Sequence, residues 1–154
     1  MGRKKVKWQA GDYFLVPLED ESYSQGQILS YEAHAMNSVV CAFSSLRFES
    51  VPTQLDAIPE KSLIAVQFTT RDLLDSGRWR IVNNGPVLSW EKYLDIQGLR
   101  RKGFIGAVIH GSGIIEKFLN AYHKLVIWND YYDPEYLDKM LISPDRKPAG
   151  VLLK

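Results

Sequence analysis

The chain has 154 residues, of which 45% are hydrophobic and 24% are charged, a composition typical of a globular protein. The 19 Lys and Arg residues nearly balance the 18 Asp and Glu residues, so the formal net charge is +1. This balance disfavours a nucleic-acid partner, because domains that bind nucleic acid usually carry a clear basic excess. The single cysteine, Cys41, excludes an internal disulfide, and its apolar surroundings indicate a buried thiol rather than a nucleophile.

The length favours a single domain over residues 1–154. Residues 1–7 are basic, and we expect them to form a solvated, frayed arm. No apolar stretch follows this arm as it would in a signal peptide, and no apolar run approaches the roughly 18 residues that a membrane span needs. We therefore expect a cytoplasmic protein that has no membrane partner.

The first strong pattern along the chain predicts a β-hairpin. Residues 11–18 and 23–29 carry aromatic and β-branched residues, and the acidic triplet 19–21 lies between them. Two such runs separated by a short polar turn are typical of paired antiparallel strands. Gly26 within the returning strand indicates a bulge or a close approach of another group to the backbone.

More strands are predicted through the first two thirds of the chain. Residues 38–43 are almost wholly apolar, which is typical of a buried central strand. In residues 62–69, alternation places Ile64, Val66 and Phe68 on one face, so that face should pack on a core. The other expected strands are a continuation of the hairpin at 28–33 and two segments at 79–82 and 104–110.

Helical signals begin at residue 70. Residues 70–77 are expected to form one or two helical turns, with Thr70 as the N-cap and Gly77 at the end. A longer amphipathic helix is expected over 112–122, with Ser112 as its cap.

Asp133 followed by Pro134 predicts the start of another helix, because Asp is a strong cap and Pro suits the first helical position. Its apolar stripe consists of Tyr136, Leu137, Met140 and Leu141. The remaining segments are predicted to be a basic loop at 97–103, a short strand at 125–128, a loop at 143–148 and an edge strand at 151–153.

Strands therefore dominate early in the chain and helices late. This segregation favours the α+β class, mainly β. We expect a twisted antiparallel sheet or a partly open small barrel, with two or three short helices mostly in the C-terminal half.

Three blocks of the sequence carry a family resemblance. They are the hairpin at 11–29, the strand and Gly-Pro turn of Trp79 to Val87, and the segment from Gly111 to Leu141. In this order the blocks resemble the immunity protein 26 family, which is found beside bacterial polymorphic toxins; the third block is similar to a related subgroup. Members usually have Asp-Gly at the hairpin tip, where this chain has Asp20 and Glu21. Because a residue other than Gly disfavours a tight turn, the loop 19–22 is expected to be longer and more open than in those members.

The resemblance implies a non-enzymatic immunity protein of the kind that acts in contact-dependent inhibition. Such a protein binds a cognate toxin C-terminal domain and neutralises it by occluding its active site. Many toxins of these systems are nucleases with basic substrate clefts, which an acidic and aromatic surface would complement. The candidate partner-binding residues are Glu19, Asp20, Glu21, Trp128, Asp130, Tyr131, Tyr132 and Asp133.

Tyr and Trp are enriched at interface hot spots, which favours the segment 128–133 as a contact site. In the alternative interpretation, Trp128 and one tyrosine belong to the core and Asp133 is only a helix cap. The two acidic segments, 19–21 and 130–138, form one surface only if the fold brings them together.

The sequence offers no pattern for catalysis, a cofactor or a metal. The histidines His34, His110 and His123 form no close ligand pair, and Ser112 does not lie in a Gly-x-Ser-x-Gly elbow. Two other functions stay open. One is a small nucleic-acid-binding module that uses the basic residues of the arm 3–7 and the loop 100–102. The other is a small hydrolase that uses His110 or His123.

Overall fold

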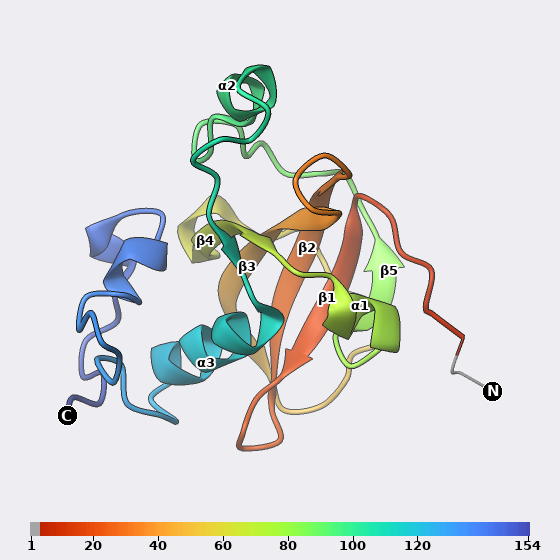
Figure 1. The fold of residues 1–154 in the computed structure, drawn as a ribbon. Helices are drawn as coiled ribbons and strands as arrows, with labels where there is room; N and C mark the ends of the chain where they lie inside the picture. The colour runs from red at the N-terminus through yellow and green to blue at the C-terminus, as the bar shows by residue number, and fades with distance from the viewer. Residues whose placement is uncertain (1–3) are drawn as a thin grey trace.

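The computed structural model of the protein describes residues 4–154, and a single open β-sheet lies at its centre (Figure 1). The strand order is β5-β1-β2-β3-β4-β6; the first five strands pair antiparallel, and β6 runs parallel to β4. The strands are β1 (Asp12–Pro17), β2 (Tyr23–Glu32), β3 (Ser38–Phe48), β4 (Leu63–Thr69), β5 (Arg80–Asn84) and β6 (Ile109–His110). The helices are α1 (Asp72–Ser76), α2 (Ile96–Arg101) and α3 (Ser112–Tyr122), with 3₁₀ turns η1 (Glu60–Ser62), η2 (Asp138–Met140) and η3 (Pro144–Arg146).

This architecture confirms the predicted α+β class, mainly β. Of the two predicted forms, it is the antiparallel sheet, and the sheet does not close into a barrel. Two of the three α-helices within residues 4–154 lie in the C-terminal half, as expected.

The hairpin between β1 and β2 has a compact tip, and the predicted openness relative to other members of the resembling family stays a prediction. Leu18 donates its backbone N–H to Ser22 at 2.8 Å, and Glu21 donates to Leu18 at 3.1 Å. The turn is closed because Glu21 adopts a left-handed conformation, with φ 69°. A three-residue loop that ends in this conformation is a common hairpin connection, and it normally places Gly there.

Gly26 confirms both interpretations of a glycine within a strand. The pairing of β2 with β3 shifts in register between Ser24 and Gly26, which is a bulge. A Cβ atom at Gly26 would lie 2.5 Å from the Phe14 ring and 2.9 Å from the Ala42 carbonyl oxygen. The close approach of the Phe14 ring to the backbone is therefore possible only because residue 26 has no side chain.

A bulge in β4 makes the predicted side-chain faces of this strand partly wrong. The register of β3 against β4 shifts between Phe43 and Ser44, opposite Ile64. Ile64 therefore packs with Ala65 in one core, whereas Val66 and Phe68 pack in the core on the opposite face of the sheet. Strict alternation cannot hold across an extra residue in a strand.

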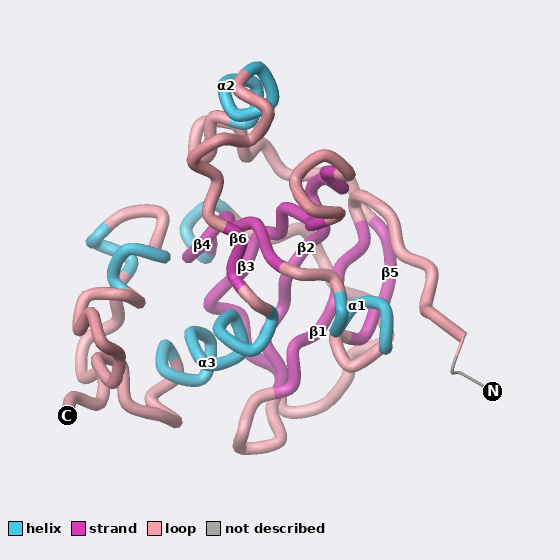
Figure 2. The backbone as a smooth tube through the Cα atoms, viewed as in Figure 1, coloured by secondary structure: helices cyan, strands magenta, loops and turns pink. Residues whose placement is uncertain are grey.

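Both faces of the sheet are covered. On one face, α3 packs its residues Ile115, Phe118 and Leu119 into the largest core, in which the ring of Trp79 stacks on Phe14 with centroids 5.4 Å apart. The opposite face is covered by the loop from 50 to 59 and by the segment from 86 to 109. Figure 2 shows how much of this cover is loop rather than regular structure. Cys41 lies within the first core, and burial raises the pKa of its thiol.

The caps differ from those predicted. Thr70 does not cap α1, because the N-cap is Arg71. The Thr70 hydroxyl instead donates to the Asp72 carboxylate at 2.6 Å. Ser112 is the first residue of α3 rather than its cap, and its hydroxyl donates to both Asp72 carboxylate oxygens at 2.8 and 2.9 Å. Asp72 therefore joins the starts of two helices. Gly77 ends α1 with φ 83°, as predicted.

The predicted basic loop at 97–103 mostly forms helix α2. Its N-cap is Asp95, which accepts a hydrogen bond from the Gly98 N–H at 3.0 Å. The strand predicted at 104–110 shrinks to β6 because Phe104 and Gly106 adopt positive φ angles of 65° and 89°, which turn the chain.

The helix predicted from Asp133 is wrong. Residues 133–141 form turns and the short η2, and the Asp133 carboxylate accepts a hydrogen bond from the Glu135 N–H at 3.0 Å. The strands predicted at 125–128 and 151–153 reduce to a single bridge between Ile127 and Leu152. The segment after α3 is thus nearly free of regular structure (Figure 2).

Candidate partner-binding surfaces

The tip of the β1–β2 hairpin presents the predicted acidic residues to solvent. Glu19 is tied to α3 because its backbone N–H donates to the Asn120 side chain at 2.8 Å. Asp20 forms an ion pair with Arg47 and accepts a hydrogen bond from the Ser22 N–H. Glu19 and Glu21 are exposed and form no ion pair with any group of residues 4–154, so they carry the remaining negative charge of the tip.

The aromatic residues of 128–132 have three different environments. Trp128 has an exposed fraction of 0%; it packs on Phe118 and donates from Nε1 to Asp138 at 3.1 Å. The alternative interpretation holds for this residue: Trp128 belongs to the core, and it cannot touch a partner while the protein is folded. Tyr132, in contrast, has an exposed fraction of 106%.

Tyr131 is half-buried. Its ring stacks on Tyr136 with centroids 5.2 Å apart, and the Lys117 ammonium lies 5.1 Å from the centroid of the Tyr131 ring. Burial, with smaller contributions from Tyr136 and Asp130, raises the pKa of Tyr131 to about 12. The phenol therefore stays neutral at any physiological pH.

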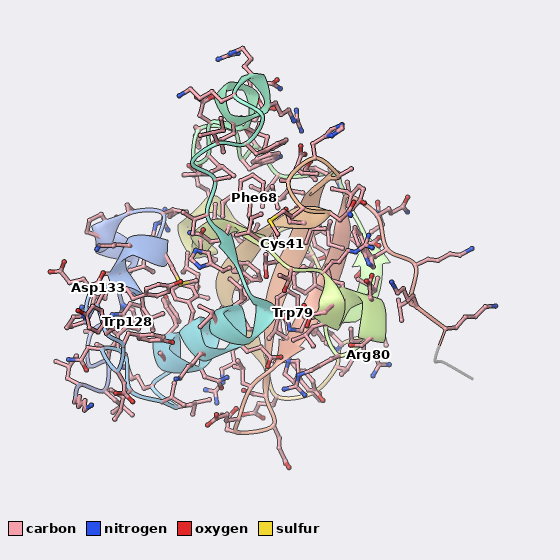
Figure 3. All side chains as sticks on the ribbon, in the orientation of Figure 1. Cys41, Phe68, Trp79, Arg80, Trp128 and Asp133 are labelled. Atoms are coloured by element: carbon pink, nitrogen blue, oxygen red, sulfur yellow. The ribbon has the colours of Figure 1, made fainter. Side chains whose placement is uncertain are left out.

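The carboxylates of the C-terminal segment are paired with lysines. Asp130 lies 3.2 Å from Lys154, Asp133 lies 2.7 Å from Lys139, and Asp138 lies 2.8 Å from Lys147. A paired carboxylate adds little to the long-range field, because the two charges cancel beyond the pair. The acidic field expected over 130–138 is correspondingly reduced. Figure 3 shows Trp128 and Asp133 on the opposite side of the view from Arg80 and α1.

The two acidic segments border the same helix but are separated by a lysine. Glu19 bonds to Asn120 of α3, and it lines a small hollow of about 260 Å³ together with Lys117. Lys117 also lies over the Tyr131 ring. A cation therefore lies between Glu19 and the aromatic segment, so we treat the hairpin tip and the segment around Tyr132 as two surfaces.

A surface that no sequence pattern indicates lies beside α1. The described part of the expected frayed arm runs along this helix: the Val6 N–H donates to the Asp75 carbonyl at 2.8 Å, and Trp8 Nε1 donates to the Asp75 carboxylate at 2.8 Å. A groove of about 720 Å³ lies between the arm, Tyr31 of β2 and Arg71. A second hollow of about 500 Å³ shares Lys5, Arg71 and Asp75 with it. We call these two neighbouring hollows together the arm groove.

The arm groove has an ordered aromatic wall. Trp8 meets the edge of Tyr31 with ring centroids 5.8 Å apart, and the Arg71 guanidinium lies 5.8 Å from the Tyr31 ring centroid. The same guanidinium lies 3.5 Å from the Asp75 carboxylate. These residues are far apart in the sequence, so local spacing could not reveal them; the only local signal is a tryptophan directly after a run of lysines.

The basic residues assigned to nucleic-acid binding have different environments. Arg3 lies outside the described residues. Arg100 is held by Glu32, with nitrogen–oxygen distances of 3.0 and 2.8 Å. Burial alone would raise the pKa of Glu32, but the hydrogen bonds from Arg100 and Ser30 outweigh it and lower that pKa. Arg101 and Lys102 are exposed on α2 and the residue after it.

The histidines do not form the pair that a hydrolase would need. His110 Nδ1 lies 3.1 Å from the Tyr136 hydroxyl, whereas the Ser112 hydroxyl donates to Asp72. His123 Nε2 is buried and has no hydrogen-bond partner within residues 4–154. Burial, and to a smaller extent Arg47, lowers the pKa of His123 to about 4, and burial lowers that of His110. His110 and Ser112 therefore form no hydrogen bond of the nucleophile–base kind within residues 4–154.

Over residues 4–154, no group of three or more His, Cys, Asp or Glu side chains is placed to hold a metal ion. Across the same residues, no helix has the length and apolar character to cross a membrane.

The class of protein follows from these features: a mainly β protein of the α+β class that displays charged and aromatic surface features at the hairpin tip, at Tyr132 and in the arm groove. The family model of immunity protein 26 matches residues 9–100, more than half of the chain. The chain belongs to the immunity protein 26 family. As the family name states, its members are immunity proteins, so a toxin is the kind of partner that the family implies.

The matched region contains β1 to β5 and α1, and it ends within α2. It includes the hairpin and the Trp79–Val87 block, which carried the resemblance. The third block, Gly111 to Leu141, lies beyond it. No curated protein and no solved structure matches the chain.

Proposed function

We propose that this protein binds the toxin domain of its own system and neutralises it by covering the toxin's active site. The observation that carries the proposal is the family match over residues 9–100, which contains five of the six strands of the sheet. An inhibitor of this kind needs a rigid surface rather than a reactive group, because occlusion requires only a stable complex. The antiparallel ladder beneath the hairpin supplies that rigidity.

We propose the hairpin tip as one contact with the toxin. Glu21 keeps a left-handed conformation that normally selects Gly, and such strain in an exposed turn often marks a functional position. Glu19 and Glu21 project charge that no described group neutralises. Such charge would speed association with a basic surface, as the substrate cleft of a nuclease would present. The proposed target class is accordingly a nuclease domain.

Tyr132 is proposed as a second contact because its side chain is fully exposed. Tyrosine provides a large contact area and a polar tip at low entropic cost. Asp20, Asp130, Tyr131 and Asp133 remain proposed contributors at the rims of the two surfaces. Their pairing or partial burial makes them less informative targets for mutation than Glu19, Glu21 and Tyr132.

The test is a pulldown from the bacterium that encodes the chain, with the tagged protein as bait and mass spectrometry as the readout. Recovery of one stoichiometric toxin C-terminal domain supports the proposal. Recovery of nucleic acid that is lost at raised salt would support the nucleic-acid-binding alternative instead. Recovery of neither from cells that express the toxin contradicts the proposal.

A matched pair of variants tests the tip. The double change Glu19→Lys and Glu21→Lys should slow association with the recovered toxin domain and reduce its dependence on salt. The control is Glu91→Lys with Asp145→Lys, which makes the same charge change at exposed carboxylates without ion pairs to residues 4–154, away from the hairpin. Equal association rates for the two double variants would remove the tip from the interface.

A further inference from the structure

The arm groove is built from three separate parts of the chain. The arm supplies Lys5 and Trp8, β2 supplies Tyr31, and the start of α1 supplies Arg71. Hydrogen bonds and ring contacts fix these parts to one another: Trp8 to Asp75, Trp8 to Tyr31, and Arg71 over Tyr31. A surface whose aromatic and cationic groups are already held in place loses little entropy when a partner binds.

The charges of the groove favour a carboxylate. Lys5, Lys7 and Arg71 line it, against the two carboxylates of Asp72 and Asp75. Both carboxylates are already engaged: Asp75 accepts from Trp8, and Asp72 accepts from Thr70 and Ser112. The lysine ammonium groups keep donors free, because the Lys5 side chain is 73% exposed and its distance to Asp75 is 4.0 Å.

A serine whose buried hydroxyl has no hydrogen-bond partner in the described part of the chain lies at the wall of this groove. Ser38 has an exposed fraction of 1%, and its Oγ has no hydrogen-bond partner within residues 4–154. Ser38 lines the second hollow together with Lys5 and Arg71. A buried hydroxyl that makes no hydrogen bond is costly, so this wall of the groove is a locally unfavourable part of the fold.

The rim of the groove carries an exposed apolar side chain in a strained position. Met36 has an exposed fraction of 86%, and Met36 and Asn37 adopt φ angles of 57° and 55°. A left-handed conformation is unfavourable for methionine. The Met36 side chain is also exposed, so no hydrophobic burial offsets this cost. Methionine is, however, well suited to irregular binding surfaces because it is flexible and polarisable.

We propose that the arm groove docks an acidic loop of the toxin domain, with a carboxylate beside Lys5 and Lys7 and an apolar side chain against Met36 and Tyr31. This inference rests on the proposed function and names the chemistry of the partner. The carboxylate accepts hydrogen bonds from the exposed ammonium groups of Lys5 and Lys7, while Arg71 adds its charge beside Tyr31. The groove thus takes an acidic segment of the partner, whereas the acidic hairpin tip is proposed to meet a basic one.

A protein loop fits better than a nucleic acid. A bound strand would run several phosphates along the groove and past Asp72 and Asp75, which repel them, whereas a single carboxylate can lie beside the exposed lysines alone. The remaining basic residues, Arg101 and Lys102, lie on and after α2 and do not line the groove. Arg78, which follows α1, lines the hollow that also contains Glu19, so the groove's helix and the hairpin tip are close enough for one partner to reach both.

A direct test uses nuclear magnetic resonance of the full ¹⁵N-labelled chain and a defined probe. The probe is a short peptide of aspartate and glutamate residues with one central phenylalanine. Its controls are the same peptide with asparagine and glutamine, and an oligothymidylate of similar length. We expect the acidic peptide alone to shift the Trp8 indole N–H and the Arg71 resonances. No shift there, or equal shifts with the amide peptide, overturns the proposal, and stronger binding of oligothymidylate would replace it with the nucleic-acid alternative.

Variants provide the second test, with the toxin domain recovered by pulldown. Lys5→Glu with Arg71→Glu should weaken toxin binding by roughly tenfold or more, as expected when complementary charges are reversed. The control, Arg101→Glu with Lys102→Glu, changes the net charge by the same amount outside the groove and should leave the affinity within about twofold. Equal losses in the two double variants would overturn the proposal.

Met36→Gly serves as a second variant in case the double variant fails to fold. Glycine suits the left-handed turn, so this variant should be at least as stable as the natural chain and yet bind the toxin more weakly. Unchanged affinity in Met36→Gly contradicts the proposed apolar contact. If the natural chain recovers no toxin domain, the proposed function fails, and the peptide titration still decides whether the groove binds a carboxylate. If the toxin binds normally to every groove variant, the proposed function stands and the groove proposal falls.

Discussion

The matched region and the segment after α3 are held together in different ways. In residues 9–100, five strands share a continuous backbone ladder, and their side chains fill cores on both faces. In residues 123–154, backbone pairing of strand type is limited to the bridge between Ile127 and Leu152. That segment is held instead by buried anchors: Trp128, Leu137 and Met140 are all at most 2% exposed.

A few hydrogen bonds attach the segment that carries these anchors to the sheet. Gln67 of β4 donates from its side chain to the Met140 carbonyl at 2.9 Å, and the Ile142 N–H donates to the Ile64 carbonyl at 2.9 Å. A ladder distributes stability over many bonds, whereas an anchored segment depends on a few large side chains. We therefore expect local opening of the C-terminal segment to need less free energy than opening of the sheet.

The largest expected effects come from replacing the two fully buried tryptophans. Trp79→Ala and Trp128→Ala should each lower the free energy of unfolding by about 3–5 kcal/mol, measured by urea denaturation. Amide hydrogen exchange should separate them: Trp79→Ala lowers protection throughout the sheet, whereas Trp128→Ala lowers it mainly in residues 123–154. Equal loss of protection across the whole chain in both variants would break the distinction between the two regions.

Gly26→Ala tests how tightly the ladder is packed. The new Cβ meets the Phe14 ring and a backbone carbonyl at distances that force one of them to move. We expect a loss of about 3 kcal/mol, near the upper end for overpacking. Gly113→Ala is the matched control, because a Cβ atom at residue 113 would have no neighbour within 4 Å and α3 should gain slightly in stability. An unchanged urea midpoint for Gly26→Ala would show that this part of the sheet is loosely packed.

His123 makes the junction between α3 and the C-terminal segment sensitive to pH. Its pKa is about 4 in the folded protein, whereas an unfolded chain has the ordinary histidine value of about 6.5. The unfolded state therefore takes up a proton as the pH falls from about 6.5 to 4 while the folded state does not, and stability is lost across that window.

At pH 5 this loss should amount to about 2 kcal/mol relative to pH 7. Burial also lowers the pKa of His110, which adds a loss of the same sign, so the comparison is made with His123→Gln rather than between pH values alone. Urea unfolding of both proteins at the two pH values measures the difference. An identical pH dependence in His123→Gln would contradict the low pKa.

Asp133→Ala should have the smallest effect. Asp133 closes one turn and forms an exposed ion pair with Lys139; it does not cap a helix. The urea midpoint and the far-ultraviolet circular dichroism should stay within error of the natural chain. A clear loss of helical signal would instead support the helix that the sequence predicts from Asp133.

The sequence predicts the regular part of this fold because its signals are local. Alternating residues with a short acidic turn identify the β1–β2 hairpin, and Gly26 marks its bulge. The alternating pattern assigns Ile64 to the wrong face of β4. The bulge that moves Ile64 to the other face arises from pairing with β3, which the local sequence does not show. The helix from Asp133 fails because Leu137 and Met140, three residues apart, reach the core from turns as well as from a helix.

The candidate site is predicted less well for a similar reason. Residue type alone cannot separate a buried Trp128 from an exposed Tyr132, because both types suit cores and interfaces. The lysines that pair with Asp130 and Asp133 become visible only when the fold is known. Trp8, Tyr31 and Arg71 meet in the arm groove through contacts between distant parts of the chain, which no local pattern encodes.

The most direct test of the central claim is a titration of the recovered toxin domain with this protein, with toxin activity as the readout. Full loss of activity at one equivalent, together with a stoichiometric complex on size-exclusion chromatography, is the result that binding and occlusion predict. A stable complex that leaves the toxin fully active would contradict neutralisation by occlusion.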